Sequence, residues 1–403
     1  MGVKLGCESK GYTRFRFLSE MLVKNGYQVD LITTDFQHWN KQHRDINHPS
    51  YKNHPYNIVF IHEPGYSKNL DLKRIISHAV AAKNISEYLE LHGNKYSLIY
   101  AEIPPNDVAR SACEFANKNH IPFVVDVNDL WPEAMKMTLN IPIISDMAFA
   151  PFSRDANYVY NHIEAAVGTS DEYANRASLN SNLKHEKLTV YVGNNLEEFY
   201  RGAKENASKV NKADDEFWVC YAGTLGASYD IKTLISAAKL CESKLESSAN
   251  SKKIVVKILG DGPDADKLKS YSTDIKAPVD FIGYTPYDEM AAYLCASDIT
   301  VNSLKKEAVQ SIVTKIGDYL ASGRPMINTG SSPEFRDKVI GDGFGLNVIA
   351  ENPEALCDCI LELYQNPETC KKMGNIAKKI AKMQFDRSQS YTKIVDLIDK
   401  LVR

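Results

Sequence analysis

Strand-like and helix-like segments alternate along this chain in two successive series, and this alternation constrains the fold more than any other feature. In the first half, apolar segments at 57–62, 97–101 and 122–127 are separated by helix-forming segments at 70–91 and 105–118. The second half repeats the alternation, with strand-like segments at 217–222, 254–259, 279–282 and 299–301. Parallel strands need crossover connections, which are usually helical, so the pattern predicts an α/β fold with parallel sheets covered on both faces.

The length of 403 residues accommodates two such domains, each with its own core. The polar and charged segment 201–216 is the best candidate for a linker. We therefore expect an N-terminal Rossmann-like domain over 1–200 and a C-terminal one over 217–385. A final helix over 386–403 has an apolar stripe with which it can pack back on the first domain, formed by Tyr391, Ile394, Ile398 and Leu401.

The start of the chain departs from this scheme. A Rossmann-like domain normally opens with a strand, a glycine loop and then a helix. Here helix signals already begin at Thr13, and residues 1–10 contain no clear strand. Gly11 and the residues after it look like the end of a glycine loop whose strand is missing. We expect a truncated or misassigned start, and the alternative is a very short strand at 3–5.

Composition excludes several classes of function. The formal net charge of −3 gives no general attraction to nucleic acid or to an anionic membrane. The eight cysteines are scattered without zinc-site or Cys-x-x-Cys spacing, which favours reduced thiols in a cytoplasmic protein. No apolar run is long enough to span a bilayer. The acidic pair Asp264 and Asp266 opens a helix, and we interpret it as structural and not as a metal site.

The segment 310–325 is the main candidate for a binding site. It follows the apolar run 299–301, and a helix is expected to begin near Ser311 and to stop at Gly323. A strand end that leads into a helix start is where α/β proteins hold phosphates. Lys315 and Asp318 are three residues apart and so share one helix face. One of them can serve a phosphate and the other a sugar hydroxyl. The alternative is an ordinary amphipathic helix.

Glycine-rich turns after three other strands of the second half support a site at the same edge. The first turn can bring backbone amides against a diphosphate. Its residues, with those of the later turns, are Gly223, Thr224, Leu225, Gly226, Gly260, Gly262 and Tyr284.

Taken together, these motifs resemble the large Glu-x7-Glu family of retaining GT-B glycosyltransferases, which is the family 4-like group. The resemblance is greatest to members in bacterial capsule, exopolysaccharide and O-antigen biosynthesis. The run from Asp318 to Pro325 matches the second half of the family motif, whereas Gln310 stands where the first acid is usual. The resemblance implies two Rossmann-like domains that face each other across a cleft, with the C-terminal helix crossing back to the first domain.

The same resemblance implies roles for individual residues. Lys315 would stabilise the leaving diphosphate, Asp318 would hold the ribose hydroxyls, and Gln310 would face the donor hexose. The donor site would also include Ser311, Ile312, the turn residues 223–226 and, against the base, Tyr284. Asp129 lies in an Asp-Leu-Trp-Pro run like that of the family and would contact a sugar. The alternative role for Asp129 is to cap the helix that follows it. Lys315 and Asp129 are thus the expected catalytic residues.

The implied reaction transfers a sugar from a nucleotide sugar, expected to be UDP-linked, to a lipid-linked or saccharide acceptor with retention of configuration. The resemblance implies neither a metal nor another cofactor. The apolar stretch 141–160 is compatible with peripheral contact at the inner membrane face, although a core helix is the alternative. Two rival functions stay open, namely a nucleotide-sugar 2-epimerase of the same architecture and a non-catalytic or degenerate subunit.

Overall fold

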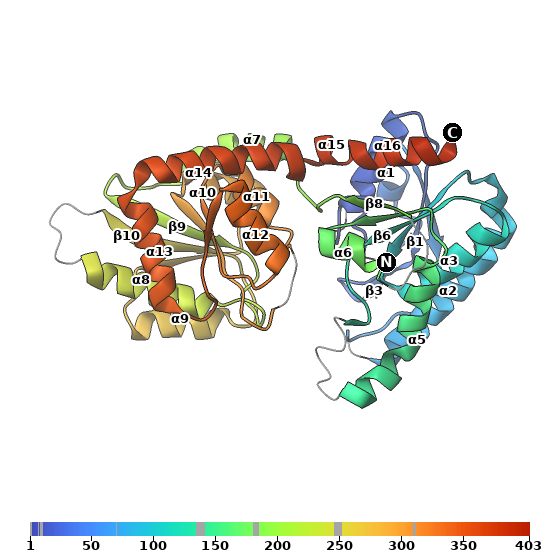
Figure 1. Ribbon diagram of the computed structural model, residues 1–403, viewed down its shortest axis with the longest axis horizontal. Coiled ribbons are helices and arrows are strands. Elements are labelled where there is room, and N and C mark those ends of the chain that lie inside the picture. The colour runs from blue at the N-terminus through green and yellow to red at the C-terminus, as the bar shows by residue number, and fades with distance from the viewer. Residues whose placement is uncertain are drawn as a thin grey trace. The chain divides into compact units, whose positions relative to one another are not determined.

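The chain forms two compact α/β units in a computed structural model (Figure 1). The structure describes residues 1–403 except 1, 7, 9–10, 70, 134–141, 180–184, 246–251 and 309–311. The first unit comprises Met1–Val190 together with Tyr391–Arg403, and the second comprises Tyr191–Ser390. Each unit is described by itself below.

The parallel strands of the first unit fall into two separate groups. A four-stranded sheet has the order β5-β6-β7-β8, with β5 (Ile99–Ile103), β6 (Phe123–Val127), β7 (Ala165–Gly168) and β8 (Glu186–Thr189). The strands β1 (Asp30–Thr34) and β4 (Asn57–Ile61) pair only with each other among the described strands. A short antiparallel hairpin, β2 (Phe36–Gln37) with β3 (Gln42–His43), follows β1.

Helices cover the first unit's strands on both faces. The helices α2 (Leu72–His92), α3 (Asn106–Lys118) and α5 (Pro142–Tyr160) share one apolar cluster with the strands (Figure 1). Helices α1 (Arg14–Lys24) and α16 (Thr392–Val402) share a second cluster on other strand residues. A short helix, α6 (Asp171–Arg176), follows β7.

A buried ion pair ties α1 to the sheet of the first unit. Arg14 donates from Nε to Asp126 at 2.9 Å and from a terminal nitrogen to the Val190 carbonyl at 3.0 Å. The same guanidinium donates to the Tyr391 hydroxyl oxygen at 3.1 Å. Both partners of a buried ion pair must be satisfied to offset desolvation, and here further hydrogen bonds achieve this. Arg14 therefore fixes both α1 and the start of the C-terminal helical segment.

Before α1, the described residues make little regular structure. Val3 forms one isolated parallel bridge with Tyr12. The Lys4 amide donates to the Tyr12 carbonyl at 2.8 Å. No described residue before Arg14 belongs to an extended strand of a sheet.

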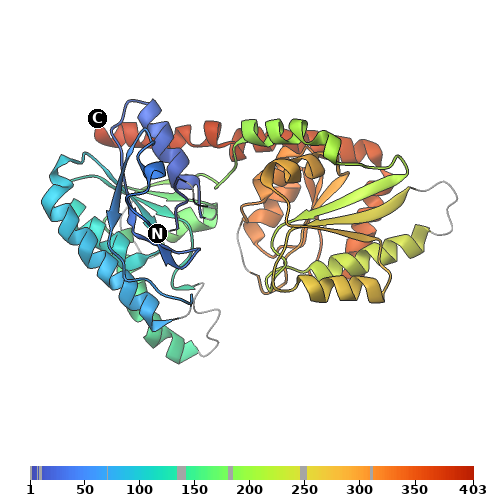
Figure 2. The same cartoon turned by 180° about the vertical axis from the view of Figure 1, so that it is seen from behind.

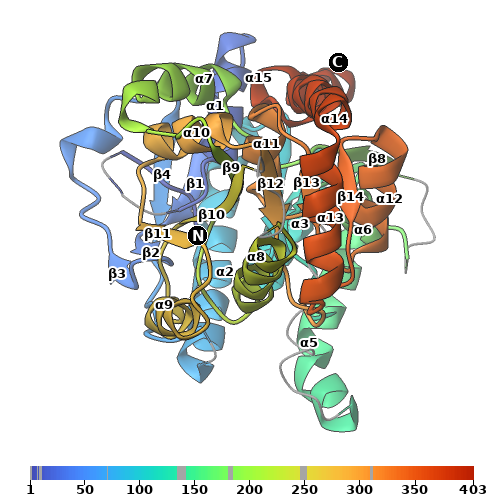
Figure 3. The ribbon, with the colours of Figure 1, turned by 90° about the vertical axis from the view of Figure 1, so that its left-hand side faces the viewer.

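The second unit contains one six-stranded sheet in which every pairing is parallel (Figure 3). Its order is β11-β10-β9-β12-β13-β14. The strands are β9 (Glu216–Ala222), β10 (Lys253–Leu259), β11 (Val279–Gly283), β12 (Ile299–Asn302), β13 (Met326–Asn328) and β14 (Gly345–Asn347). The strand β9 is central, because the chain first builds outward on one side of it and then returns to the other at β12.

Two apolar clusters cover the two faces of this sheet. One contains α8 (Ile231–Leu245), α9 (Ala265–Asp274) and α13 (Pro353–Gln365), and Figure 2 shows α8 and α9 side by side under the sheet. The other contains α10 (Tyr287–Ala296), α11 (Ile316–Ala321), α12 (Pro333–Asp342) and α14 (Pro367–Ile380). A π-helical turn over Ala381–Phe385 and the short helix α15 (Arg387–Ser390) follow α14.

The boundary between the units lies earlier than the sequence predicted. The division falls between Val190 and Tyr191, not within 201–216. The reason is α7 (Leu196–Glu205), whose Phe199 is fully buried in the core of the second unit. The segment 201–216 thus begins in a packed helix, which ends at Glu205, and reaches the first residue of β9 at Glu216. At the other end, the segment that returns to the first unit begins at Tyr391 and not at residue 386.

No helix in the described ranges is long and apolar enough to cross a membrane. Most of the stretch 141–160 that we considered for membrane contact lies in α5, while Ile141 falls outside the described residues.

Candidate donor-binding site in the second unit

The site is built at the carboxyl edge of the second unit's sheet, around β9 and β12. Strand order reverses at β9, because β10 and β12 lie on its two sides. In open parallel sheets, ligands bind at such a switch point. The turns after β9 and β10 carry the glycines that the sequence analysis selected, and the turn after β11 carries Tyr284. The helix α11 follows β12 (Figure 3).

Two glycine turns approach each other too closely for any side chain. A Cβ on Gly260 would lie 1.9 Å from the Gly223 carbonyl oxygen, and one on Gly262 would lie 2.2 Å from the Leu225 carbonyl oxygen. Gly260 also has a φ of +135°, which L side chains rarely adopt. Glycine is therefore required where the turns after β9 and β10 meet.

Some backbone amides of the first turn are already engaged. The Gly223 amide donates to the Leu259 carbonyl at 2.9 Å, and the Leu225 amide donates to the Asp261 carbonyl at 3.0 Å. The amides of Thr224 and Gly226 donate to no described residue. Of the four amides that we expected to face a diphosphate, these two remain open.

Lys315 places an ammonium group against this turn. Its Nζ lies 3.3 Å from the Tyr221 hydroxyl oxygen and 3.1 Å from the position of a Cβ built on Gly223. The same Nζ stands 4.4 Å from the ring centroid of Tyr221 and 4.1 Å from that of Tyr229. Both are favourable cation–π distances. Lys315 is thus a cation enclosed by two aromatic rings and a glycine.

The surroundings of Lys315 disfavour its charge. Burial lowers the pKa of its ammonium group to about 7. No carboxylate in the part of the chain that the structure describes forms an ion pair with it. A partly desolvated cation without a counter-ion is suited to an anionic ligand, because the ligand supplies the negative charge that no described side chain provides.

Asp318 lies on α11 and is held from two directions. Its Oδ1 accepts hydrogen bonds from the Asn194 side-chain amide at 2.7 Å and from the Tyr287 hydroxyl at 2.8 Å. Burial raises the pKa of the Asp318 carboxyl, and the two hydrogen bonds oppose that shift. Its second oxygen, Oδ2, accepts from none of the described residues. Asp318 therefore has a fixed orientation and one open acceptor.

The helix that carries these two residues is shorter than the sequence predicted. The expected start lay near Ser311, but α11 begins at Ile316, with Lys315 as its N-cap residue. Ile312 lies outside α11, half-buried against the apolar cluster on the α11 face of the sheet. Gln310 and Ser311 fall outside the described residues.

Tyr284 is a strongly exposed aromatic side chain at this edge. It is 81% exposed and follows Gly283, which has a φ of +83°. The Gly283 carbonyl accepts from the Gly260 amide at 2.7 Å, so the turn before Tyr284 is tied to the glycine turns. The exposed ring is accessible to a ligand, and its expected role in stacking on a base stays a prediction.

Asp129, the other expected catalytic residue, lies in the first unit. Its Oδ1 accepts from the Leu130 amide at 2.9 Å, and its Oδ2 accepts from the Trp131 indole at 3.2 Å. Burial raises the pKa of the Asp129 carboxyl. These contacts orient the Trp131 ring, and the central guanidinium carbon of Arg74 lies 4.5 Å from the centroid of that ring. The structure thus gives Asp129 local partners within its own turn.

Three residues of the site were missed by the sequence analysis. Asn194 and Tyr287 hold Asp318, and Tyr221 borders Lys315. All three are far from the motif in sequence, and no local pattern marks them. Asp264 and Asp266 lie at the start of α9, and no group of three or more His, Cys, Asp or Glu in the described ranges is arranged to hold a metal ion.

These features define the class of fold. Two parallel-sheet α/β units, with glycine turns at the switch point of the second, form the architecture of GT-B glycosyltransferases, and solved structures of such enzymes match nearly the whole chain. Residues 203–380 match the family model of glycosyl transferases group 1. The match covers the glycine turns, Lys315 and Asp318, whereas Asn194 lies before it.

Individual relatives are distant in sequence. An uncharacterized glycosyltransferase of Methanocaldococcus jannaschii, MJ1069, is 23% identical over 215 residues, which are 53% of this chain and 52% of that protein. The chain thus matches about half the length of this curated relative. Sucrose-phosphate synthase from Thermosynechococcus elongatus is 18% identical with a TM-score of 0.73, over 99% of this chain and 96% of that one. Anabaena HepE in complex with UDP is 13% identical with a TM-score of 0.69, over 96% of this chain and 95% of that one.

Proposed function

We propose that this protein is a nucleotide-sugar-dependent glycosyltransferase that transfers a hexosyl group with retention of configuration. The donor is a UDP-sugar. The observation that carries the proposal is the Lys315 ammonium, which lies beside the Gly223 turn without a carboxylate partner among the described residues. The match of residues 203–380 to glycosyl transferases group 1 and the similarity to a fold solved with UDP support the same donor class.

The proposed chemistry needs charge stabilisation at the leaving group. The bond between the anomeric carbon and the diphosphate oxygen breaks, and negative charge develops on the diphosphate. Lys315 and the open amides of Thr224 and Gly226 supply hydrogen-bond donors for that charge. The acceptor hydroxyl attacks the same face of the sugar and gives its proton to the departing phosphate oxygen. This step forms the new glycosidic bond with retention and uses no metal ion.

Asp318 binds the ribose of the donor in this scheme. Tyr287 and Asn194 occupy Oδ1, and the open Oδ2 accepts from a ribose hydroxyl. Hydrogen bonds to a charged acceptor contribute on the order of 1.5–3 kcal/mol each. The uracil ring stacks on the exposed Tyr284.

For the acceptor, we propose a lipid-linked saccharide at the inner membrane face, in the synthesis of a surface polysaccharide. The support is the resemblance of the motif from Asp318 to Pro325 to family members with that role. Membrane co-sedimentation of the protein and its activity on lipid-linked against free acceptors test this part. Equal activity on a free soluble sugar would count against it.

Donor binding is tested with UDP-glucose as the probe. Isothermal titration should show binding to the wild-type chain, and hydrolysis of UDP-glucose should be measurable without acceptor. Lys315→Ala should reduce hydrolysis at least a hundredfold, because it removes charge that acts on the leaving group as the bond breaks.

The matched control is Lys269→Ala, which removes an exposed lysine from α9. It should leave binding and hydrolysis unchanged. If the wild-type chain binds UDP-glucose but hydrolyses it no faster than Lys315→Ala, the protein is a non-catalytic subunit. If hydrolysis is absent and epimerised UDP-sugar accumulates, the epimerase alternative holds.

A further inference from the structure

The segments that follow the first unit's strands bring together two cations and two buried aromatic rings. Lys41 lies in the turn of the β2–β3 hairpin, which follows β1, and Arg74 lies in the first turn of α2. The buried rings are those of Tyr66, which follows β4, and Trp131, which follows β6. Ligands of α/β proteins bind beyond the carboxyl ends of parallel strands, which is where these segments lie. We call these four residues the cation–aromatic cluster.

The two cations are held close together. The Lys41 ammonium donates to the side-chain oxygen of Asn69 at 2.7 Å, and the Arg74 guanidinium donates to the backbone carbonyl of the same residue at 3.1 Å. The ring centroid of Tyr66 lies 4.7 Å from the Lys41 nitrogen and 5.5 Å from the central guanidinium carbon of Arg74. Like charges in one cluster repel each other, so the arrangement is unfavourable unless negative charge joins it.

The partners of both cations are neutral. Neither Lys41 nor Arg74 forms an ion pair with a carboxylate of the described residues. The Nε of Arg74 is buried and has no hydrogen-bond partner among those residues. Burial and the charge of Arg74 lower the pKa of Lys41, and burial lowers the pKa of Arg74. The surroundings therefore supply less negative charge than the two cations require.

Two carboxylates act on the cluster from beyond ion-pair distance. Glu63 is fully buried, and its Oε1 accepts from the Ser77 hydroxyl at 2.9 Å. Asp129 accepts from the Trp131 indole at 3.2 Å and so holds the ring against which Arg74 lies. The lowered pKa of Arg74 shows that burial outweighs the attraction of both carboxylates.

Two histidines beside the cluster stay neutral. Burial lowers the pKa of His38 and of His78 to about 3, and the nearby charges of Lys41 and Arg74 add to both shifts. His38 Nδ1 lies 2.5 Å from the Tyr66 hydroxyl oxygen, and the buried Nε2 of His78 has no described hydrogen-bond partner. A neutral imidazole offers a donor or an acceptor without adding to the repulsion.

The hairpin turn holds Lys41 in an uncommon conformation. Its φ is +54°, which is sparsely populated by residues with a Cβ. The buried Gln37 fixes the turn, since its side-chain oxygen accepts from the Trp39 amide at 2.6 Å and its carbonyl from the Lys41 amide at 2.9 Å. The turn also exposes the Trp39 ring, whose centroid lies 5.1 Å from that of Tyr12. Aromatic surface beside a few charged groups is typical of ligand sites.

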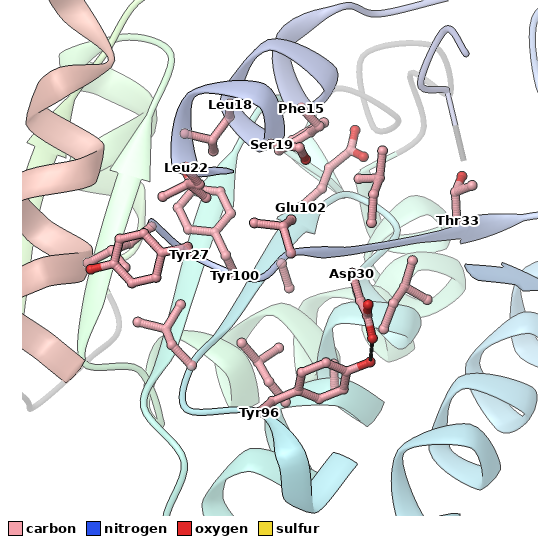
Figure 4. Close-up of a pocket in the computed structure, with 18 of the residues that line it drawn as sticks. Phe15, Leu18, Ser19, Leu22, Tyr27, Asp30, Thr33, Tyr96, Tyr100 and Glu102 are labelled. Atoms are coloured by element: carbon pink, nitrogen blue, oxygen red, sulfur yellow. Dashed lines mark hydrogen bonds between the residues drawn. The ribbon is translucent and has the colours of Figure 1, made fainter. Parts of the chain in front are cut away.

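A cavity between β1 and β5 of the same unit shows the contrasting case. It has a volume of about 480 Å³, and Lys95 is the one lysine among the described residues that line it. Lys95 forms an ion pair with Asp30 at 2.6 Å, and Asp30 also accepts from the Tyr96 hydroxyl at 2.6 Å (Figure 4). The shortage of negative charge is thus a local property of the cation–aromatic cluster.

We propose that Lys41 and Arg74 bind a phosphate group of the acceptor. A phosphate monoester carries up to two negative charges near neutral pH, as does a diphosphate linkage, so it balances two cations better than a single carboxylate does. The planar guanidinium suits two phosphate oxygens, and the ammonium adds a compact charge. That the phosphate belongs to the acceptor rests on the proposed function, whereas its binding to the first unit does not.

The test uses glucose 1-phosphate as the probe and the full chain with Lys315→Ala as the background. This background removes the lysine of the donor site, so that phosphate binding there does not contribute. Isothermal titration at pH 7.5 should show saturable binding of glucose 1-phosphate and none of glucose. Glucuronate, which carries one carboxylate, should bind at least tenfold more weakly than glucose 1-phosphate.

Variants of the two cations locate the site. In the same background, Lys41→Met and Arg74→Met should each weaken binding at least tenfold, because each removes a charged donor. The matched control is Lys73→Met, which removes the exposed lysine next to Arg74 and should leave binding unchanged. Thermal unfolding without ligand checks the fold. Lys41→Met should unfold at the temperature of its parent or above it, because the repulsion is removed.

A second probe identifies the source of the phosphate. It is glucose joined through a diphosphate to a decyl chain. Tighter binding of this probe than of glucose 1-phosphate would support phosphate recognition in a lipid-linked acceptor. Equal affinities would support recognition of a soluble sugar phosphate.

Failure of glucose 1-phosphate to bind the Lys315→Ala chain would overturn the proposal and leave the donor site in the second unit unaffected. Binding that survives both Lys41→Met and Arg74→Met, or equal affinity for glucuronate, would overturn it as well. If UDP-glucose does not bind the wild-type chain while glucose 1-phosphate binds as expected, the phosphate site stands and the proposed function does not.

Discussion

The Lys315 ammonium nitrogen lies 3.3 Å from the hydroxyl oxygen of Tyr221. The tyrosine hydroxyl is committed as a donor to the Thr224 carbonyl at 2.8 Å, so it can accept from the lysine. Through these two contacts, the Lys315 ammonium group is connected to the backbone of the glycine turn after β9. A change of charge at Lys315 is therefore felt at the turn that we propose to bind the diphosphate.

We predict that donor affinity depends on pH through Lys315. Burial lowers its pKa to about 7, and a bound diphosphate should raise the pKa again because it stabilises the charged form. Affinity for UDP-glucose should then be constant below pH 7 and fall by up to about tenfold per pH unit above it. Isothermal titration between pH 6 and pH 8.5 measures this, and UDP-glucose suits it because its diphosphate does not titrate there.

The control is Lys315→Arg, since a guanidinium stays charged throughout this range. Its affinity should be independent of pH. Parallel pH profiles for the wild-type chain and Lys315→Arg would show that another group is responsible.

We predict a second pH effect, on stability. The pKa of Lys315 is lower in the folded chain than in the unfolded one, so the unfolded state binds more protons between about pH 7 and pH 10.5. The charged lysine therefore destabilises the fold fully below pH 7, and the effect fades as pH rises above 7. Lys315→Met should be more stable than wild type at pH 6, by on the order of 1 kcal/mol, and the difference should shrink toward pH 10.

Denaturant unfolding at pH 6, 8 and 10 measures this difference. Lys269→Met, on the exposed face of α9, should show no pH-dependent difference from wild type. A difference for Lys315→Met that grows with pH would contradict the assigned burial of the charge.

Asp318 allows a test that separates ligand binding from support of the fold. Asp318→Asn keeps the shape but removes the charge, and it should weaken UDP-glucose binding about tenfold. It should change stability little, because the Asn oxygen can still accept from Tyr287 and Asn194 and because burial disfavours the charge that is removed. Tyr287→Phe removes one of these donors and leaves Oδ2 of Asp318 untouched.

Tyr287→Phe should lower stability by about 1 kcal/mol, because the buried carboxylate loses a donor, but it should weaken binding only two- to threefold. Titration calorimetry and thermal unfolding of both variants provide the comparison. Equal losses of affinity in the two variants would mean that Asp318 acts only by supporting the local structure.

The close approach of the glycine turns predicts a ranked set of stabilities. Gly260→Ala should destabilise the second unit by roughly 3 kcal/mol or more, since the new Cβ would overlap the Gly223 carbonyl and φ is +135°. In Gly283→Ala, the new Cβ meets no atom within 4 Å, so only the positive φ is unfavourable. We expect a loss of stability of about 1 kcal/mol. Gly341→Ala, inside α12 with open space around it, should be slightly stabilising.

Thermal unfolding of the three variants tests this order. A Gly260→Ala variant as stable as Gly341→Ala would show that the two turns are not in contact in solution.

Local patterns in the sequence were enough to predict the class of fold. Alternation of apolar segments with amphipathic ones defines parallel strands and their covering helices, and the α/β fold predicted from it is confirmed. The GT-B architecture, which the resemblance of the motifs implied, is confirmed as well. Sequence patterns predicted the boundary between the two units less accurately. The charged face of α7 had the composition of a linker, although Phe199 on its other face is buried in the core.

The groups at the carboxyl edge of the second sheet could be predicted without the structure, because the glycine turns and the lysine-containing segment each follow a strand in the sequence. Their roles as a donor site stay predictions. The burial and the hydrogen-bond partners of those groups became known from the folded structure alone. Burial lowers the pKa of Lys315, whose ammonium group lies against two tyrosines distant in sequence, and Asp318 is oriented by Asn194, 124 residues away. The physical reason is that desolvation and hydrogen bonding depend on which groups come together in space, whereas secondary structure depends largely on near neighbours in the chain.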